Sequence, residues 1–303
     1  MTDLNTLKIV LTCNGRTLSM GPGEDIDITK VTGLEASEFE ISTSDNALVD
    51  GVSVDGKKIN SRPIHIEAAF RHLNANPQNR AKLVKFFNPK YTGKALIENM
   101  GTPRNIEYEL EGWSINEASN FNSRIKFTVD LMCPDPYMQN VDNFGKNLAN
   151  ITALWAYPFY CTKQKVYDLP LKYRGLALGG VAAGYRTLRQ EVALANDGDV
   201  PTGVQIQFVA TRGPVTNPKI ELLNTGQYVR VVLEMAMGDV LLIDTNERHQ
   251  IIELNGVNIY HKIDRKSDPF QLAVGDNSLE YSADENYVNL DVNVYYTPKY
   301  LGV

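Results

Sequence analysis

Apolar and polar residues alternate most regularly in the second half of the chain. Val204, Ile206 and Phe208 are separated by glutamines, and the same alternation recurs from residue 229 to residue 235. It recurs again from Val288 to Tyr296. A period of two places one set of side chains on one face of a β-strand, so these segments are expected to be strands with one buried face.

Short turn sequences separate these predicted strands. Asn196-Asp-Gly-Asp199, Gly238-Asp239, Asn255-Gly256 and Gly275-Asp276-Asn277 contain the residue types that accept a positive φ. Short strands at this spacing indicate a sandwich or barrel, and solvated polar faces favour an antiparallel two-sheet sandwich. The chain as a whole is therefore predicted to be mainly β, with a minor α+β part in its first half.

One short helix is predicted in the first half. Asn76 is a suitable N-cap, Pro77 fits the first helical turn, and Pro89 ends an apolar stripe of Ala81, Leu83, Val84 and Phe87. The other side is basic, which is typical of a solvated helix face. This helix is expected to lie on a β-sheet.

Residues 105–132 are predicted to form a β-hairpin. Ile106 and Tyr108 would face the core, as would the apolar residues of the return strand. With a loop centred near residues 118–119, Glu111 would pair with Lys126. The carboxylates on the outer face share one solvated environment, which does not suit acid–base catalysis.

The remaining chemistry-bearing residues are scattered. The 303-residue chain has net charge −6, with acidic and basic residues spread evenly, so no basic surface for nucleic acid is expected. Cys13, Cys133 and Cys161 form no metal-binding pair and are expected to be reduced structural thiols. The four histidines are widely spaced. No catalytic, metal or cofactor site is predicted, and the chain is not expected to be an enzyme.

The first residues, MTDLNTLKIVLTCNG, contain only a short apolar run. Such a run is too short for a signal peptide or a membrane span, so no membrane insertion is expected and folding is placed in a cytoplasm.

A boundary between two domains is predicted at Cys133-Pro134-Asp135-Pro136-Tyr137, where two prolines stop the preceding strand. The sequence around this boundary resembles the distal tail proteins (Dit) of long-tailed, siphovirus-type phages, the siphovirus tail component family. The ordered motifs that carry the resemblance are Val31-Thr-Gly-Leu34, Asp50-Gly51, Arg62-Pro-Ile-His-Ile66, Arg104-Asn-Ile-Glu-Tyr108, Asn196-Asp-Gly-Asp199, Asn217-Pro218, Gly238-Asp-Val-Leu-Leu-Ile-Asp244, Asp268-Pro-Phe-Gln-Leu272 and Gly275-Asp-Asn277.

The resemblance implies an architecture and a set of partners. Residues 1–138 would be an N-terminal ring-forming (belt) domain, and residues 139–303 a C-terminal galectin-like antiparallel β-sandwich. Six copies would form a ring at the distal end of the tail tube, assembled in the bacterial host cytoplasm and located in the virion tail. Neighbours would be the tail tube protein, the tail hub with its tail-associated lysin or fibre protein, and a receptor-binding or baseplate protein. DNA would only pass through the lumen.

Two sets of residues are candidates for contacts. Arg62 and Arg104, together with the pair Glu111 and Lys126, are predicted to form ion pairs at a subunit interface or within the sheet, because guanidinium groups suit carboxylates in partly buried places. An alternative function is a carbohydrate-binding module that recognises host cell-surface saccharide through the sandwich. Its candidate surface, which could equally meet a protein partner, consists of Tyr228, Tyr260, Tyr287 and Tyr295.

Overall fold

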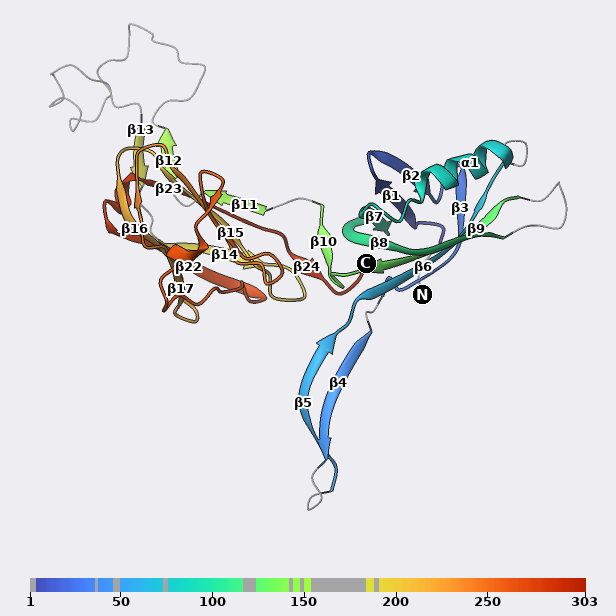
Figure 1. Ribbon diagram of the computed structural model, residues 1–303, viewed down its shortest axis with the longest axis horizontal. Helices are drawn as coiled ribbons and strands as arrows, with labels where there is room; N and C mark the ends of the chain where they lie inside the picture. Colours follow the sequence, from blue (N-terminus) through green and yellow to red (C-terminus); the bar gives the residue numbers. More distant parts are fainter. Residues whose placement is uncertain are drawn as a thin grey trace, which may run out of the picture. The chain divides into compact units, whose positions relative to one another are not determined.

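The computed structural model describes residues 4–35, 38–45, 50–72, 76–116, 124–141, 144–147, 150–153, 184–187 and 191–303. It separates into two compact units (Figure 1). The first comprises Met1–Asn143, Asp197–Pro201 and Thr297–Val303, and the second comprises Phe144–Asn196 and Thr202–Tyr296. The prediction of a mainly β chain is confirmed, and the described helices are short.

The first unit is built on an antiparallel sheet with the strand order β2-β1-β7-β8-β9-β6-β3, in which β10 also pairs with β8 and β24 pairs with β10. Its strands are β1 (Lys8–Cys13), β2 (Arg16–Met20), β3 (Ile26–Thr32), β6 (Arg62–Phe70), β7 (Gly93–Asn99), β8 (Thr102–Asn116), β9 (Lys126–Cys133), β10 (Met138–Asn140) and β24 (Lys299–Tyr300).

The one α-helix of the described residues, α1 (Asn76–Phe86), lies against the core of this unit. Leu83, Phe86 and Phe87 are buried, whereas Val84 is 55% exposed. The Phe87 ring packs 5.4 Å from Trp113 and 6.3 Å from Phe127, which joins the end of the helix to strands β8 and β9. The predicted helix on a sheet is therefore confirmed, but Ala81 and Val84 of the predicted stripe are exposed, and Phe86 is buried in the core instead.

Strands β8 and β9 form the predicted hairpin, but the predicted pairing of Glu111 with Lys126 is wrong. Lys126 lies opposite Asn116, and a β-bulge falls between Leu110 and Gly112, at Glu111. The bulge moves the inward positions from even to odd numbers, so Trp113 and Ile115 follow Leu110 against the core. A uniform alternation cannot predict this change of phase. The pairing itself was misplaced by several residues because the loop was centred near residues 118–119, whereas the observed register pairs Asn116 with Lys126.

The second unit is a β-sandwich. Its six-stranded sheet has the order β11-β23-β15-β19-β20-β21, and its five-stranded sheet has the order β14-β22-β16-β17 with β18 beside β16. The strands are β11 (Phe144–Asn147), β14 (Glu191–Asn196), β15 (Gln205–Ala210), β16 (Val215–Leu222), β17 (Gln227–Arg230), β18 (Glu234–Met235), β19 (Val240–Asp244), β20 (Ile251–Leu254), β21 (Val257–Asn258), β22 (Gly275–Glu285) and β23 (Leu290–Tyr296). A separate pair is formed by β12 (Asn150–Ala153) and β13 (Gly184–Thr187).

The inward faces of both sheets share one apolar core, as the alternation predicted. Ile206 and Phe208 of one sheet and Ile220 and Tyr281 of the other are fully buried members of it. The last strand starts later than predicted, because Val288 lies in a 3-10 turn, η4 (Tyr287–Asn289), and is 38% exposed. Asn286, which precedes the turn, has a φ of 60°, so the alternation begins only at Leu290.

The chain passes between the two units four times, because two short segments of the C-terminal half belong to the first unit. These segments pair with each other through Val200 and Lys299. Tyr300 lies opposite Met138 of β10, and Lys299 forms an ion pair of 3.3 Å with Asp135. The segment that follows the sandwich is thus part of the sheet of the first unit.

Gly93 provides a test of the packing in this sheet. It lies opposite Tyr108 in the β7–β8 pair, and a Cβ atom at residue 93 would overlap the buried Tyr108 ring. Replacing Gly93 with Ala is therefore expected to lower the free energy of unfolding of the first unit by about 1–3 kcal/mol, the usual cost of overpacking. Urea denaturation measures this change.

The matched control is Gly112→Ala, where a Cβ would meet only Asp130 Oδ2, at 3.6 Å. Its effect should stay within about 0.5 kcal/mol. Equal stability of the two variants would show that Tyr108 does not constrain residue 93.

Candidate assembly interface

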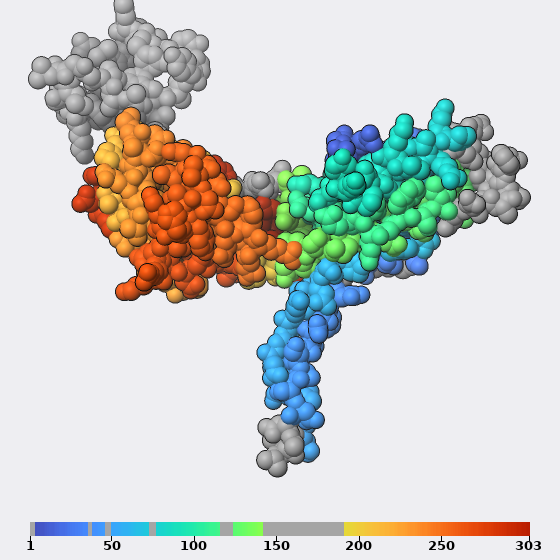
Figure 2. All heavy atoms as spheres, viewed as in Figure 1, coloured from blue at the N-terminus to red at the C-terminus, as the bar shows by residue number. Residues whose placement is uncertain are grey.

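A two-stranded hairpin, which we call the arm, extends from the first unit between β3 and β6 (Figure 1). It consists of β4 (Phe39–Asp45) and β5 (Val52–Ile59). Every residue of these strands is exposed except Ile59, which is half-buried. The space-filling view shows the same hairpin standing clear of the atoms of its own unit (Figure 2).

One face of the arm is largely apolar, although Lys57, opposite Ile41, and Asp45, opposite Val52, also lie on it. Phe39 lies opposite Ile59 and Thr43 lies opposite Val54, so these side chains share a face with Ile41 and Val52. A bulge at Asp55 changes the phase of β5, so the even-numbered Val52 and Val54 lie on the same face as the odd-numbered Lys57 and Ile59. The Asp55 carboxylate accepts a hydrogen bond of 2.9 Å from Ser44 Oγ. The polar face carries Glu40, Ser42, Ser53 and Lys58.

The exposure of the apolar face is unusual for a free surface. Phe39 is 70% exposed, Val52 61%, Val54 56% and Ile41 46%. An isolated two-stranded hairpin is marginally stable in water, and a contiguous exposed apolar face marks an interaction site. The arm is therefore the strongest candidate for a contact surface among the described residues.

Arg62, at the start of β6, holds the base of the arm. Its side chain is fully buried, and within the described residues its hydrogen bonds all go to backbone carbonyls. Nε donates to Pro136 O at 2.8 Å, Nη1 to Gly33 O and Leu34 O at 2.9 and 3.1 Å, and Nη2 to Leu301 O. The predicted ion pair of Arg62 is corrected by this finding: carbonyl oxygens take the place of a carboxylate.

Among the described residues, no carboxylate forms an ion pair with this buried cation. Cys133 lies opposite Arg62 in the β6–β9 pair, and burial raises the pKa of its thiol to about 12, so the thiol is uncharged at neutral pH. Burial also lowers the pKa of the Arg62 guanidinium below its usual value. The oriented carbonyl dipoles are what stabilise the charge.

Two glycines allow backbone segments to approach Arg62 closely. Gly33 has a φ of 91°, and a Cβ there would overlap the Pro63 carbonyl oxygen. A Cβ at Gly302 would lie 2.9 Å from Glu35 O and 3.1 Å from Leu34 O. The chain leading into the arm is therefore packed between β6 and residues 301–303.

Arg104 also differs from the prediction. Its guanidinium lies 3.5 Å from the centroid of the Tyr300 ring, a cation–π contact that links β24 to β8, the two strands that pair with β10. Glu111 and Lys126 are exposed and lie on different parts of the hairpin. The structure thus brings Arg62 and Arg104 to the same segment, residues 300–301, and leaves Glu111 and Lys126 apart.

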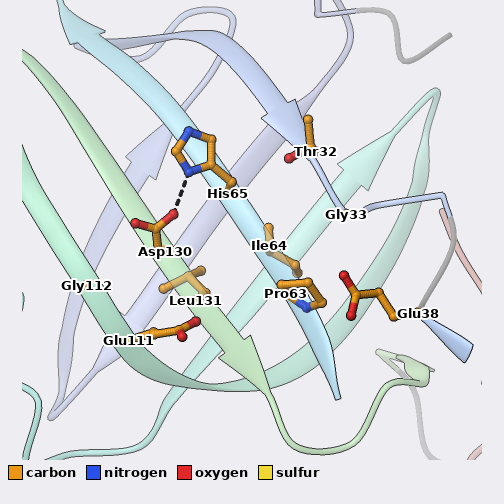
Figure 3. A pocket seen from close by; sticks show the side chains of 10 residues that line it. All are labelled: Thr32, Gly33, Glu38, Pro63, Ile64, His65, Glu111, Gly112, Asp130 and Leu131. Carbon is orange, nitrogen blue, oxygen red and sulfur yellow. Dashed lines mark hydrogen bonds and ion pairs between the residues drawn. The ribbon is translucent and has the colours of Figure 1, made fainter. Parts of the chain in front are cut away.

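Glu111 lines a hollow of about 540 Å³ on the outer face of the sheet, beside the base of the arm (Figure 3). Asp130 Oδ1 lies 2.5 Å from His65 Nδ1 in this hollow, and Glu38 and Thr32 contribute to its wall.

No group of three or more His, Cys, Asp or Glu residues suited to a metal ion occurs in the described part of the chain. No described helix is long and apolar enough to cross a membrane.

The four candidate tyrosines lie on different elements of the second unit. Tyr228 is on β17, Tyr260 on the 3-10 helix η3 (Tyr260–Lys262), Tyr287 on η4 and Tyr295 on β23. Tyr228 is half-buried below Lys219 Nζ, 4.5 Å from its ring centroid, and Tyr287 packs against the core. Tyr260 and Tyr295 are each 38% exposed. The positions do not describe one stacking surface.

Comparisons with known proteins agree with this architecture. Residues 197–300 match the family model of the siphovirus-type tail component, C-terminal domain. The crystal structure of the Dit protein of phage SPP1, described as a paradigm of the hub adsorption apparatus in phages that infect Gram-positive hosts, matches with a TM-score of 0.67 and 14% identity over 97% of this chain and 99% of that one. The predicted resemblance to the distal tail proteins is confirmed.

A chain of the phage P2 baseplate in its activated conformation with calcium is also similar to this protein, with a TM-score of 0.52 and 11% identity over 98% of this chain and 99% of that one. No curated protein matches the sequence. At these identities the solved structures establish a shared distal tail protein fold.

Several motifs that carried the resemblance meet at the base of the arm. Gly33 comes from Val31-Thr-Gly-Leu34, Arg62 begins Arg62-Pro-Ile-His-Ile66, and Pro136 lies in the boundary motif. The arm itself was missed. Its signal in the sequence was two short alternating runs on either side of Asp50-Gly51, which is typical of a hairpin, but nothing in the pattern shows that the hairpin leaves the sheet.

The carbonyl contacts of Arg62 lead to a prediction. Arg62→Lys keeps the charge, but one ammonium group cannot reach carbonyls on separate segments, so buried acceptors lose their donors. We expect a loss of about 2–4 kcal/mol in the free energy of unfolding of the first unit, measured by urea denaturation. Arg16→Lys, at an exposed position, is the control and should change it by less than about 0.5 kcal/mol. Equal values would mean that the four contacts contribute no stability.

Proposed function

We propose that this protein is a structural component of a phage tail that forms a hexameric ring at the distal end of the tail tube. The ring joins the tube to the tail hub, with its tail-associated lysin or fibre protein, and to receptor-binding or baseplate proteins. It leaves a channel for DNA. The protein is assembled in the bacterial host cytoplasm and belongs to the virion tail.

The observation that carries this proposal is the shared fold over nearly the whole chain. The matching solved chains come from a phage hub adsorption apparatus and a phage baseplate, and both units of this protein are included in the match. The family model supports the same role independently, because it is a tail component model. These relatives are structural proteins, which favours a structural role over catalysis.

The arm supplies a physical route to a ring. Its apolar face cannot be covered by its own unit, because the strands stand clear of the sheet from which they leave (Figure 2). Copies that each place an arm on the next copy make the same heterologous contact around a closed ring, which buries every apolar face. Such a contact between copies requires no rearrangement of the sheet of the first unit, because the arm already extends from it.

The charge of the chain suits a channel through which DNA passes. Each copy carries net charge −6, and the acidic and basic residues are spread along both halves. A conduit without a concentrated basic surface lets DNA pass with little nonspecific binding. Specific recognition of nucleic acid is therefore not part of the proposed function.

The alternative, carbohydrate recognition by the sandwich, receives no support from the described tyrosines. A sugar site usually places an aromatic face beneath the ring and polar groups around it, whereas Tyr228 and Tyr287 are partly buried and Tyr260 and Tyr295 lie on separate elements. Binding of cell-wall saccharide by the full-length protein, abolished by Tyr295→Ala, would restore this alternative.

The mass of the native protein tests the ring. Light scattering over a concentration series is expected to show a species of roughly 200 kDa, six times the 33.8 kDa chain, because a closed cyclic assembly has a defined size. Replacing both Phe39 and Ile41 with Ser should shift this species to the monomer, while the free energy of unfolding changes by less than about 0.5 kcal/mol because both side chains are exposed.

The matched control changes the other face of the same arm. Glu40 and Lys58 lie opposite each other on the polar face, and replacing both with Ser alters the arm without touching its apolar side. This variant should assemble like the unmodified chain. A monomeric unmodified chain at every concentration, or equal assembly of both double variants, would contradict the proposed role of the arm.

A further inference from the structure

We propose that Arg62, Leu301 and Gly302 form a clamp that fixes the base of the arm, so that the position of the arm depends on the chain segment that follows the sandwich. The clamp is a positioning device: none of these residues lies on the apolar face of the arm. It adds to the proposed function by naming what holds the contact surface in place.

Among the described residues, the strand pairing is interrupted at the base of the arm. The β3–β6 pairing ends at Thr32 opposite His65, and the β4–β5 pairing begins at Phe39 opposite Ile59. Across this interval the described backbone is bridged by a hydrogen bond of 2.8 Å from Asn60 N–H to Glu38 O. A long ribbon that is interrupted in this way bends easily at the interruption, unless other contacts hold it.

Arg62 supplies such contacts at the level of the break. Its Nη1 group binds Gly33 O and Leu34 O on the strand that leads into the arm, while its own backbone belongs to the strand that leaves the arm. The planar guanidinium fixes both strands together in one orientation, because its donors point in set directions. The two sides of the ribbon are therefore joined where their backbone pairing is interrupted.

Residues 301–303 supply the other half of the clamp. Leu301 O accepts a hydrogen bond from Arg62 Nη2, and Gly302 packs against the backbone of Leu34 and Glu35. Leu301 N–H in turn donates a hydrogen bond of 3.0 Å to Asp199 Oδ2, and Val303 packs against the apolar core of the first unit. The arm is thus held by a segment that is itself anchored in the sheet.

The segments that complete the first unit are continuous in sequence with strands of the sandwich. Residues 297–303 continue directly from the last strand of the sandwich, and residues 197–201 join two strands of the sandwich through the first unit. The segment that contacts Arg62 therefore follows the last strand of the sandwich directly in the chain, although it packs in the first unit.

Hydrogen exchange of the Asn60 amide tests the clamp, because this amide bridges the break. In Gly302→Ala the new Cβ would meet Glu35 O at 2.9 Å and displace residues 301–303, whereas Arg62 remains present. We expect exchange at Asn60 to become at least tenfold faster, with unchanged exchange in strand β15 of the sandwich. Arg62→Lys should give the same local acceleration.

The exchange is measured in the Phe39→Ser/Ile41→Ser background, so that a neighbouring copy cannot protect the arm. Gly56→Ala is the control, since no atom lies within 4 Å of the Cβ that it adds to the arm. Failure of the ring would leave this measurement intact. If Asn60 exchanged at the control rate in both Gly302→Ala and Arg62→Lys, the clamp would be refuted even if the ring formed.

Discussion

The buried guanidinium of Arg62 is the interaction on which the layout of the first unit depends. Removing an ion from water costs several kcal/mol unless its donors are satisfied, and here they are satisfied by carbonyl oxygens from three separate segments. Each segment must be in place for the charge to be tolerated. One side chain therefore ties together the base of the arm, the exit of β9 at Pro136 and the segment at Leu301. The stabilisation is conditional, because loss of any one segment leaves a buried donor unpaired.

The sequence predicted the sandwich well because its strands obey a simple rule. In β15 and β23 one face is buried and the other is solvated, so the period of two is unbroken and the core residues follow from it. Alternation failed where the backbone departs from a regular strand. The bulge at Glu111 exchanges the faces of β8, and the left-handed Asn286 delays the start of β23. Both departures involve one residue, and neither residue type identifies a departure by itself.

The contact surface was harder to predict than the core for a different reason. An exposed apolar strand has the same pattern as a buried one, so Phe39 and Ile41 give no sign that their partner is missing. Arg62 was selected for the right property, a guanidinium in a buried place, but assigned the wrong kind of acceptor. Carboxylate acceptors can be located in a sequence, whereas backbone carbonyls belong to every residue and therefore cannot be singled out. Contacts to the backbone become visible only when the chain path is known.

The hairpin must expose an apolar face before assembly, and it must also be held in a fixed direction at its base. An apolar face that is left in water until assembly lowers solubility, and a short arm limits how much of this face a misdirected contact can reach. A freely pivoting arm would add the loss of its own freedom to the free-energy cost of each contact, whereas an arm fixed at its base has lost most of that freedom on folding. The buried charge of Arg62 and the close approach of the backbone at Gly33 and Gly302 thus fix the direction of the hairpin before a contact forms. A contact repeated around a closed ring needs this property most, because angular errors at successive contacts add and prevent closure.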